Sequence, residues 1–395
     1  MTRTSRFRLE PMRPRDPSEE GRTASSLELF FDLVFVVAVS VASVQLHHAL
    51  TEGHVWEGIF HYAIAFFSIW WSWMNFTWFA TSFDNDDWLY RVLTFVQMAG
   101  VLVLASGIGP AFEDGDFTVL VLAYVVMRLS MVAQWLRAAW GAEETRRAAL
   151  LYAGGVAFVQ LLWVGSLWLP GPIHTVSLVV LILCELSVPI IAERKQRTPS
   201  HPHHITERYG LFTLILLGES LLGSANAIIE SLHSGEDQAP LVRLGVLALV
   251  ATAALWWIYF WPPHHRAIKT FAGSLLYGYG HYFIFAAAGA FSAGIELEID
   301  VLTGHTDVTQ PGASFAYTIP LAIFIIGVWL LTIRRNADRI VNIAVPLAGF
   351  LVLIDPLIPV PFALTVVILV AVVAVLVWRR PLGDQQPQQS PVVSL

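Results

Sequence analysis

Long apolar stretches recur along the whole chain, and this feature constrains its fold more than any other. Stretches long enough to cross a bilayer as helices follow one another from Leu29 to Trp378. A helix needs about 20 apolar residues to cross roughly 30 Å of hydrocarbon. Only 13% of the 395 residues are charged, whereas a soluble domain carries about a quarter. We therefore expect an all-α polytopic integral membrane protein.

The apolar pattern predicts about twelve transmembrane helices. The eleventh, 339–355, is the least regular, because it contains Pro346 and ends at Asp355-Pro356. The predicted spans are 29–50, 57–80, 88–109, 117–137, 149–169, 172–192, 208–230, 241–261, 271–294, 315–334, 339–355 and 358–378.

The distribution of lysine and arginine predicts the orientation, because short cytoplasmic loops carry an excess of positive charge. The loops after the fourth, sixth, eighth and tenth predicted spans are basic, as is the segment after the last span. The intervening outer loops lack Lys and Arg, apart from Arg243 at the outer start of the eighth span. This alternation favours an even number of spans with both termini in the cytoplasm.

Local sequence matches favour an internal duplication into two six-helix halves. Four residues recur at a constant shift of 187, namely Tyr90, Ala99, Gly107 and Ile108 against Tyr277, Ala286, Gly294 and Ile295. Because six is even, the halves would have a parallel orientation, and sites in such proteins lie near the repeat interface at the midplane. The predicted parts are a disordered cytosolic N-terminal tail (1–26), a first half (27–192), a cytosolic linker (193–206), a second half (207–380) and a disordered C-terminal tail (381–395).

Several classes of site lack their signatures in this sequence. The single cysteine, Cys184, excludes an intrachain disulfide and a cysteine-based metal site. The adjacent histidine pairs 203–204 and 264–265 do not have the spacing of a zinc-binding helix. A P-loop and a GxSxG motif are absent as well. We therefore expect no cofactor, no metal and no nucleic-acid partner.

Charged residues inside the apolar stretches are the main candidates for function, because a charge at the bilayer centre costs at least about 2.5 kcal/mol. Asp32, Arg128, Glu185 and Glu219 lie within predicted spans, and Glu28 precedes Asp32 by four residues. Glu28 and Asp32 therefore share one face of the first helix. Two carboxylates there repel each other unless a proton, a cation or an arginine relieves them.

Arg128 is expected to pair with an acid, because it lies near the middle of its span. One arginine can neutralise one of Asp32, Glu185 and Glu219, which leaves two carboxylates for a proton, a cation or water. This count favours proton or cation handling over anion binding. The alternative is structural: Arg128 and its partner fix the helix packing, and hydrogen bonds satisfy Asp32.

Secondary candidates surround these charges. Glu207 and Arg208 open the seventh span, and Asn226 continues a polar stripe beyond Glu219. His281 is either part of a proton relay or a hydrogen-bonded packing residue. Trp73 and Trp257 belong to tryptophan clusters in the second and eighth spans. These clusters form either an interfacial belt with packing contacts or an aromatic cage for a cationic ligand.

Two long motifs resemble the bacterial low temperature requirement A (LtrA) family. They are Ser26-Leu-Glu28-Leu-Phe-Phe-Asp32-Leu-Val-Phe35 and Glu207-Arg208-Tyr-Gly210-Leu-Phe212-Thr-Leu-Ile-Leu-Leu-Gly218-Glu219-Ser220. The resemblance runs from about Leu27 to beyond Gly294. It implies a bacterial inner-membrane protein whose characteristic charged residues are Glu28, Asp32, Arg128, Glu207, Arg208 and Glu219. The family name refers to growth in the cold and implies no defined molecular activity.

Three functions are consistent with these observations. The first is a transporter or channel for a proton, a monovalent cation or a small cationic solute, with Asp32 and Glu219 binding the ion. The second is a non-transporting membrane protein that binds a lipid or protein partner. The third is an enzyme that acts on lipids within the membrane. Acids in a water-filled vestibule would favour the first, acids sealed by arginines the second, and a lateral opening beside the acids the third. The bilayer is a partner in every case, and the oligomeric state is not readable from the sequence.

Overall fold

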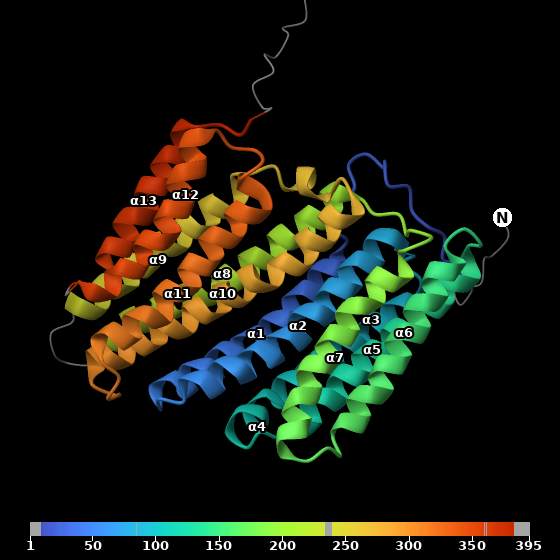
Figure 1. The fold of residues 1–395 in the computed structure, drawn as a ribbon, viewed down its shortest axis with the longest axis horizontal. Coiled ribbons are helices and arrows are strands. Elements are labelled where there is room, and N and C mark those ends of the chain that lie inside the picture. Colours follow the sequence, from blue (N-terminus) through green and yellow to red (C-terminus); the bar gives the residue numbers. More distant parts are fainter. Residues whose placement is uncertain (1–8, 84, 234–238, 359, 361, 383–395) are drawn as a thin grey trace, which may run out of the picture. The chain divides into compact units, whose positions relative to one another are not determined.

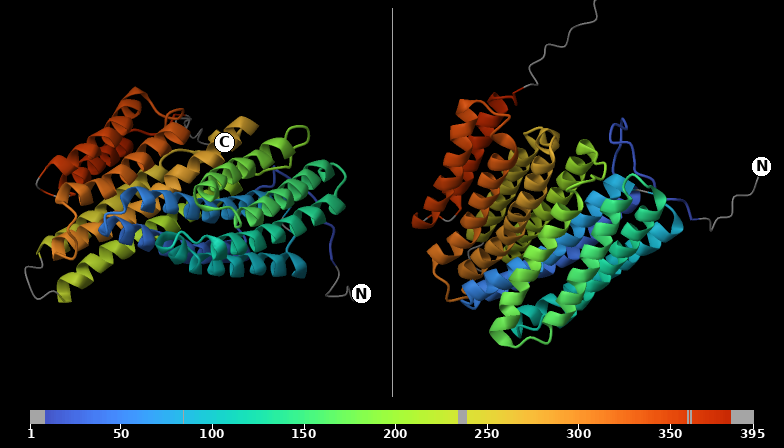
Figure 2. Two further views of the ribbon diagram at one scale, coloured as in Figure 1. Left: turned by 60° about the horizontal axis from the view of Figure 1, so that its bottom comes forward. Right: turned by 45° about the vertical axis from the view of Figure 1, so that its right-hand side comes forward.

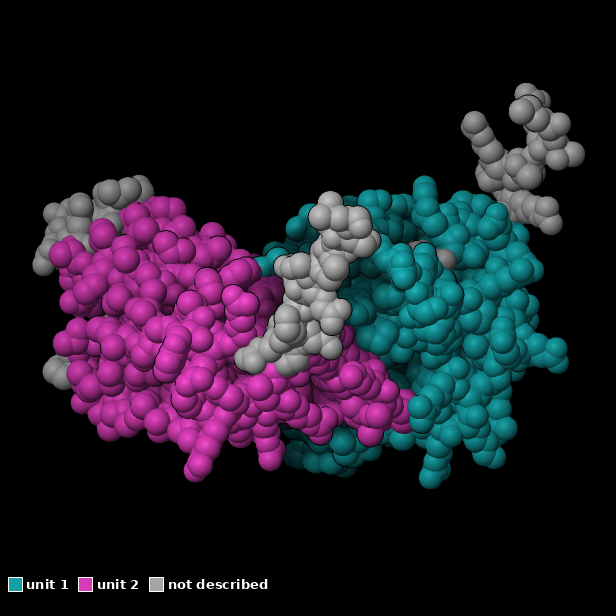
Figure 3. Space-filling view, turned by 90° about the horizontal axis from the view of Figure 1, so that it is seen from above, with its two compact units in different colours: residues 1–216 teal, residues 217–395 magenta. Residues whose placement is uncertain are grey.

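The computed structural model of the protein is all-helical in the residues that it describes, 9–83, 85–233, 239–358, 360 and 362–382 (Figure 1). The side chains of residues 227 and 230–233 also lie outside the description. So do 1–8 and 383–395, which make up part of the predicted tails. The chain divides into two compact units, residues 1–216 and 217–395, shown in different colours in Figure 3.

Unit 1 is built around α2, a long helix whose residues from His61 to Phe83 are almost all buried. Helix α1 packs against α2 and α3, α5 packs against α3 and α6, and α6 packs against α7. The helices of this unit are α1 (Ser26–Thr51), α2 (Val55–Phe83), α3 (Trp88–Ser106), α4 (Ile108–Glu113), α5 (Thr118–Gly141), α6 (Arg146–Ser166), α7 (Gly171–Ala192) and the first part of α8 (Pro202–His233).

Unit 2 contains the rest of α8 and the helices that follow it. Helices α10 and α11 pack along each other, while α13 packs against α9 and α12. Figures 1 and 2 show α12 and α13 side by side. The elements are α9 (Ala239–Phe260), the 3-10 helix η1 (His264–Ile268), α10 (Phe271–Thr303), α11 (Gln310–Val328), the π-helix η2 (Trp329–Ile333), α12 (Arg339–Leu351), the 3-10 helix η3 (Val352–Leu357) and α13 (Ala363–Trp378).

Nine helical segments of the described chain are long and apolar enough to cross a membrane. They are 26–51, 88–113, 118–141, 146–166, 171–192, 239–260, 271–303, 310–333 and 339–357. The prediction of a polytopic all-α protein is confirmed at this level. The other three predicted spans coincide with α2, α8 and α13. Helix α13 has only 16 residues, and α2 is rich in Trp, Ser and Thr, most of which are buried within the protein.

Local sequence signals determine where several helices begin. The Ser25 hydroxyl accepts a hydrogen bond from the Glu28 backbone N–H, and the Glu28 side chain accepts one from the Ser25 N–H, which forms a capping box for α1. Asp87 caps α3 and Thr270 caps α10 in a similar way. Each cap satisfies backbone N–H groups that would otherwise lack partners, and this stabilises a helix by about 1 kcal/mol.

The segment before α1 lies against unit 1. Met12 and Arg22 are 1% and 8% exposed. The Arg15 backbone N–H donates to the Ser82 carbonyl at 2.9 Å. The Arg22 guanidinium donates to the Thr81 and Ala80 carbonyls at 2.6 and 2.9 Å. These are carbonyls of the last turn of α2, which have no intrahelical partners. Residues 9–25, part of the tail that composition predicts to be disordered, thus make specific contacts in the structure.

Candidate functional site

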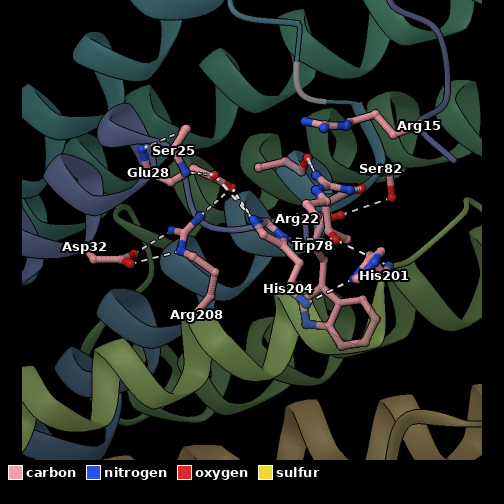
Figure 4. A network of polar contacts seen from close by, with 12 residues as sticks. Arg15, Arg22, Ser25, Glu28, Asp32, Trp78, Ser82, His201, His204 and Arg208 are labelled. Carbon is pink, nitrogen blue, oxygen red and sulfur yellow. Dashed lines mark hydrogen bonds and ion pairs between the residues drawn. The ribbon is translucent and has the colours of Figure 1, made fainter. Parts of the chain in front are cut away.

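A buried ion-pair network joins α1 to α8 (Figure 4). The Arg208 guanidinium donates from Nε to Asp32 Oδ2 at 2.9 Å and from Nη2 to Asp32 Oδ1. Its Nη1 donates to Glu28 Oε1 at 2.8 Å. All three residues are at most 1% exposed. The two-pronged contact with Asp32 matches the planar fork of arginine to the planar carboxylate, which is the strongest geometry for such a pair.

Further hydrogen bonds complete this network. Glu28 Oε2 accepts from the Ser25 backbone N–H at 2.8 Å, and His204 Nε2 lies 3.2 Å from Glu28 Oε1. Trp73 Nε1 donates to Asp32 Oδ1 at 2.7 Å. Glu28 lies one helical turn before Asp32 on the same face of α1, and His204 lies one turn before Arg208 on the same face of α8. The Arg208 cluster is defined here as Ser25, Glu28, Asp32, Trp73, His204 and Arg208.

The Arg208 cluster contains one more acid than it has permanent cations. With Glu28 and Asp32 ionised and His204 neutral, its formal charge is −1. An uncompensated buried charge is costly. One proton, on His204 or on a carboxylate, makes the cluster neutral.

Contacts on the side of this cluster that faces the N-terminal segment are also polar. His204 Nδ1 lies 3.1 Å from the Thr81 hydroxyl. His201 Nε2 lies 2.9 Å from the Glu19 carbonyl, and the Ser82 hydroxyl donates to the Pro199 carbonyl at 2.6 Å. The end of α2, the N-terminal segment and the start of α8 are therefore tied together beside the cluster (Figure 4).

A second buried ion pair links four helices of unit 1. Arg128 Nη2 on α5 lies 3.0 Å from Glu185 Oε2 on α7, and the two side chains are 1% and 0% exposed. Glu185 also accepts from Trp71 Nε1 on α2 at 3.0 Å and from Gln160 Nε2 on α6 at 2.7 Å. We call these four residues the Arg128 cluster. It pairs one acid with one arginine, so it is neutral with both groups charged.

The acid-to-arginine count expected from the sequence therefore changes. Arg128 pairs with Glu185, while Arg208 contacts both Asp32 and Glu28. Sequence reasoning placed Arg208 at the opening of a span. Helix α8 begins at Pro202, however, and Arg208 lies fully buried in its second turn. Asp32 is thus not left to a proton or a cation alone, since an arginine is already bound to it.

The other sequence candidates lie elsewhere. Glu219 is 7% exposed, and its backbone carbonyl accepts from the Ser292 hydroxyl at 3.1 Å. Asn226 donates to Glu296 Oε1 at 2.8 Å. Glu207 is half-buried. Its neighbour Arg208 contacts Glu28 and Asp32. Trp257 is 40% exposed on α9.

His281 belongs to a cluster of aromatic and histidine side chains in unit 2. Its Nδ1 lies 2.7 Å from the Tyr277 carbonyl, and its Nε2 lies 3.1 Å from the Tyr259 hydroxyl. The Tyr277 hydroxyl lies 3.0 Å from His264 Nδ1. Burial lowers the pKa of His264, which lies in η1 between two helices, to about 4. His264 is therefore neutral at physiological pH and acts as a hydrogen-bonding group.

Several buried polar residues were not among the sequence candidates. His204 falls in the predicted linker 193–206, although its position four residues before Arg208 is a helical spacing that indicates a shared helix face. Gln160 gives no such signal, because a single amide within an apolar stretch has many possible roles. Glu298 falls in a predicted loop and Asp355 at the end of a predicted span, yet they are 0% and 1% exposed. Glu298 accepts a hydrogen bond from Gln310, and Asp355 accepts one from Tyr317.

The fold and its buried charges define a multi-pass, all-α membrane protein. Comparison with known families agrees: the pattern of the bacterial low temperature requirement A protein (LtrA) matches residues 23–378. The chain belongs to the LtrA family, and the resemblance seen in its two acidic motifs is confirmed.

One curated relative comes from Rhizobium meliloti (strain 1021), where it is described as uncharacterized protein RA0937. It is 28% identical over 271 residues, which cover 64% of this chain and 62% of that protein. The match thus spans less than two thirds of the relative's length. No solved structure matches the chain.

Proposed function

We propose that the protein is a proton-handling transporter or channel and that the Arg208 cluster holds the transported or coupling proton. The observation that carries this proposal is the charge balance of the cluster. Glu28, Asp32 and Arg208 are fully buried, and two acids face one guanidinium. The site therefore changes between formal charges of −1 and 0 when it loses or gains one proton.

The groups that would exchange this proton are close together. His204 Nε2 lies 3.2 Å from Glu28 Oε1, which is within the reach of direct proton transfer. Arg208 stays charged under all physiological conditions, so it holds the carboxylates in place while the proton moves. A monovalent cation or a small cationic solute could compensate the same charge, and the experiment below separates these cases.

A structural role is the second candidate, and the sealing of both clusters favours it. The side chains of Arg208, Glu28 and Asp32 are at most 2% exposed, and those of the Arg128–Glu185 pair at most 1%. Under this alternative the clusters fix helix packing, and the protein serves the envelope by binding a lipid or a protein partner. The two roles make different predictions for ion flux.

We further propose twelve spans in two parallel six-helix halves, 27–192 and 207–380. The helices of the two halves follow one another in the same order, with α1, α2 and α3 corresponding to α8, α9 and α10. Asp32 and Glu219 are separated by 187 residues, the same shift that relates Tyr90 to Tyr277. Asp32 and Glu219 would thus occupy equivalent positions in the first helix of each half.

Two matched glycines support the same duplication. A Cβ on Gly107 would lie 2.6 Å from the Leu120 backbone nitrogen at the start of α5. A Cβ on Gly294, at the equivalent position, would lie 2.6 Å from the Ala316 carbonyl oxygen on α11. In both halves, therefore, a glycine allows the third helix to approach the backbone of the fourth.

The proposed topology places both termini and the linker 193–206 in the cytoplasm of a bacterial cell, with the protein in the inner membrane. Its support is the alternation of basic loops. Single cysteines introduced at Ser200 and Ser234 in a Cys184→Ser background test it, because a membrane-impermeant thiol reagent applied to intact cells would label only the second. Labelling of position 200 alone would show that the protein has the opposite orientation in the membrane.

Reconstitution in liposomes tests the proton proposal. The purified full-length protein is exposed to a pH gradient with the membrane potential clamped by valinomycin, and a trapped dye reports internal pH. We expect proton flux above that of protein-free vesicles, and loss of this flux in Asp32→Asn and His204→Asn. A parallel potassium gradient with a potassium dye detects cation movement instead.

The control is Arg91→Gln, which removes an exposed ion pair with Asp86 and leaves both buried clusters intact. Thermal melts of each variant establish that it is folded. Absence of flux in the parent, together with a lower melting temperature for Asp32→Asn, would reject proton handling and support the structural role. Unchanged flux in folded Asp32→Asn and His204→Asn would show that the Arg208 cluster does not lie on the proton pathway.

A further inference from the structure

A polar cavity of about 300 Å³ opens at one end of unit 1, among the end of α1, the start of α2 and the short helix α4. In Figure 1, α4 lies near the turn between α1 and α2. The glutamates that line it are Glu52, Glu57 and Glu113, and its histidines are His48, His54 and His61. Its lining contains neither lysine nor arginine, so no permanently charged cation within the lining offsets the three glutamates.

The floor of this cavity is a buried histidine. His61 is 7% exposed, and its Nδ1 has no hydrogen-bond partner among the described residues. Its ring is held edge-on between Phe112 and Phe117, with centroids 5.6 and 5.5 Å away. A buried ring nitrogen without a partner costs free energy, and a ligand that donates a hydrogen bond would relieve this cost.

The rim carries the charge. Glu52, Glu57 and Glu113 are exposed around the opening, and Glu52 Oε2 lies 3.7 Å from Nδ1 of His54, another lining residue. Close packing fixes the wall, because a Cβ on Gly58 would lie only 2.6 Å from the Ala49 Cβ. The cavity thus combines a closely packed wall at Gly58 with exposed carboxylates at its rim.

We infer that this cavity binds a small organic cation of the protonated amine class. An ammonium group offers the hydrogen-bond donor that His61 Nδ1 lacks, and its positive charge is complementary to the three glutamates. The volume also fits an organic molecule, because small-molecule sites begin at about 300 Å³. A bare metal ion is a poorer match, since the described residues hold no group of three or more His, Cys, Asp or Glu side chains arranged to bind one.

This inference is independent of proton handling by the Arg208 cluster, since the two sites share no residue. The cavity lies at the opposite end of α1 from Glu28 and Asp32. The site would serve equally as the entrance for a cationic substrate or as a receptor site on a protein that transports nothing.

Isothermal titration calorimetry on the purified full-length protein tests the inference, with putrescine as the probe. We expect saturable binding at neutral pH and no binding of 1,4-butanediol, which has a similar length but no charge. His61→Phe keeps the aromatic packing and removes the ring nitrogen, and we expect it to weaken binding roughly tenfold or more. Glu113→Gln should also weaken binding, whereas Glu143→Gln, an exposed acid outside the cavity, should not.

Defined results would overturn the inference. Absence of saturable putrescine binding, or equal affinities for the parent and His61→Phe, would reject the site. Binding of Zn²⁺ in place of putrescine would reject the organic-cation class. Should His61→Phe fail to fold, the exposed Glu57→Gln and Glu113→Gln variants decide the matter, because unchanged affinity in both would exclude the acidic walls from binding.

Discussion

Glu185→Leu is expected to be among the most destabilising single changes in unit 1. Glu185 is the acid that Arg128 contacts, at 3.0 Å, and both side chains are at most 1% exposed. The substitution leaves a guanidinium that cannot lose its proton buried between helices. It also removes the acceptor for Trp71 and Gln160.

The magnitude follows from the burial. Removing one partner of a buried ion pair costs about 3–5 kcal/mol. For a unit of 150–250 residues, each kcal/mol lowers the melting temperature by about 2–4 °C. We therefore expect a fall of roughly 6–20 °C in the thermal transition of the purified protein, followed by tryptophan fluorescence.

Arg128→Met should cost less than Glu185→Leu, because a lone buried carboxylate can become neutral by binding a proton, and Trp71 and Gln160 still donate to it. The double variant should be more stable than Glu185→Leu alone, since a well-packed apolar pair often replaces a buried ion pair without loss. The four melting temperatures form a double-mutant cycle. Additive losses in the double variant, or a larger loss for Arg128→Met, would refute this account of the cluster.

Three further predictions concern caps, packing and pH. Asp87 caps α3 and pairs with Arg137; burial alone would raise its pKa, but these contacts hold it below 3.8. The stability that they give is therefore present above about pH 3.8 and is lost as the pH falls through the lower folded-state pKa. Asp87→Asn should thus be less stable than the parent at pH 6, with a gap that narrows in melts below pH 3.8. Gly294→Ala should lose about 1–3 kcal/mol in denaturant melts, because its Cβ would meet the α11 backbone at 2.6 Å; Gly154→Ala, where a Cβ meets nothing within 4 Å, should be neutral or slightly stabilising. Burial raises the pKa of Glu193 above 4.5, so its contribution to stability is complete below pH 4.5 and is lost as the pH rises through the folded-state value; Glu193→Gln should flatten this part of the pH–stability profile, and a profile as steep as the parent's would contradict it.

The sequence was sufficient for the membrane character of the fold because hydropathy acts locally. Each apolar stretch reports its own environment, and the described residues are all-helical, with nine segments long and apolar enough to cross a membrane. Helix α2 shows where this logic weakens. The apolar pattern predicts a span at 57–80, but α2 is not among the nine segments that are long and apolar enough to cross a membrane, and most of its Trp, Ser and Thr side chains are buried within the protein. Whether such a helix faces protein or lipid depends on its position within the bundle, and the sequence of a single chain does not specify that position.

The site was predicted less completely, because its partners are distant in sequence. Helix periodicity placed Glu28 and Asp32 on one face, and the structure keeps them together on Arg208. Arg208 lies 176 residues beyond Asp32 along the chain, and its pairing depends on how α8 packs on α1. The choice of Glu185 for Arg128 is of the same kind. Charge counting is reliable only when every arginine that enters the bilayer has been recognised.

The different charge balances of the two clusters give a final prediction that bears directly on the proposed proton site. Glu28→Gln leaves Asp32 paired one-to-one with Arg208, and glutamine at this position can still cap α1. Glu185→Gln instead leaves Arg128 without a counter-charge. We therefore expect Glu28→Gln to cost about 1 kcal/mol, as for loss of a single hydrogen bond, and Glu185→Gln about 3–5 kcal/mol.

Thermal melts of these two variants at neutral pH measure the difference, and both changes replace a buried glutamate by its closest uncharged analogue. Equal losses would mean that the second acid of the Arg208 cluster is as necessary for charge compensation as the single acid of the Arg128 cluster. The excess negative charge would then be absent, and with it the physical reason for the cluster to bind a proton. A small loss for Glu28→Gln, by contrast, is the result expected when the Arg208 cluster holds one more acid than its arginine can neutralise.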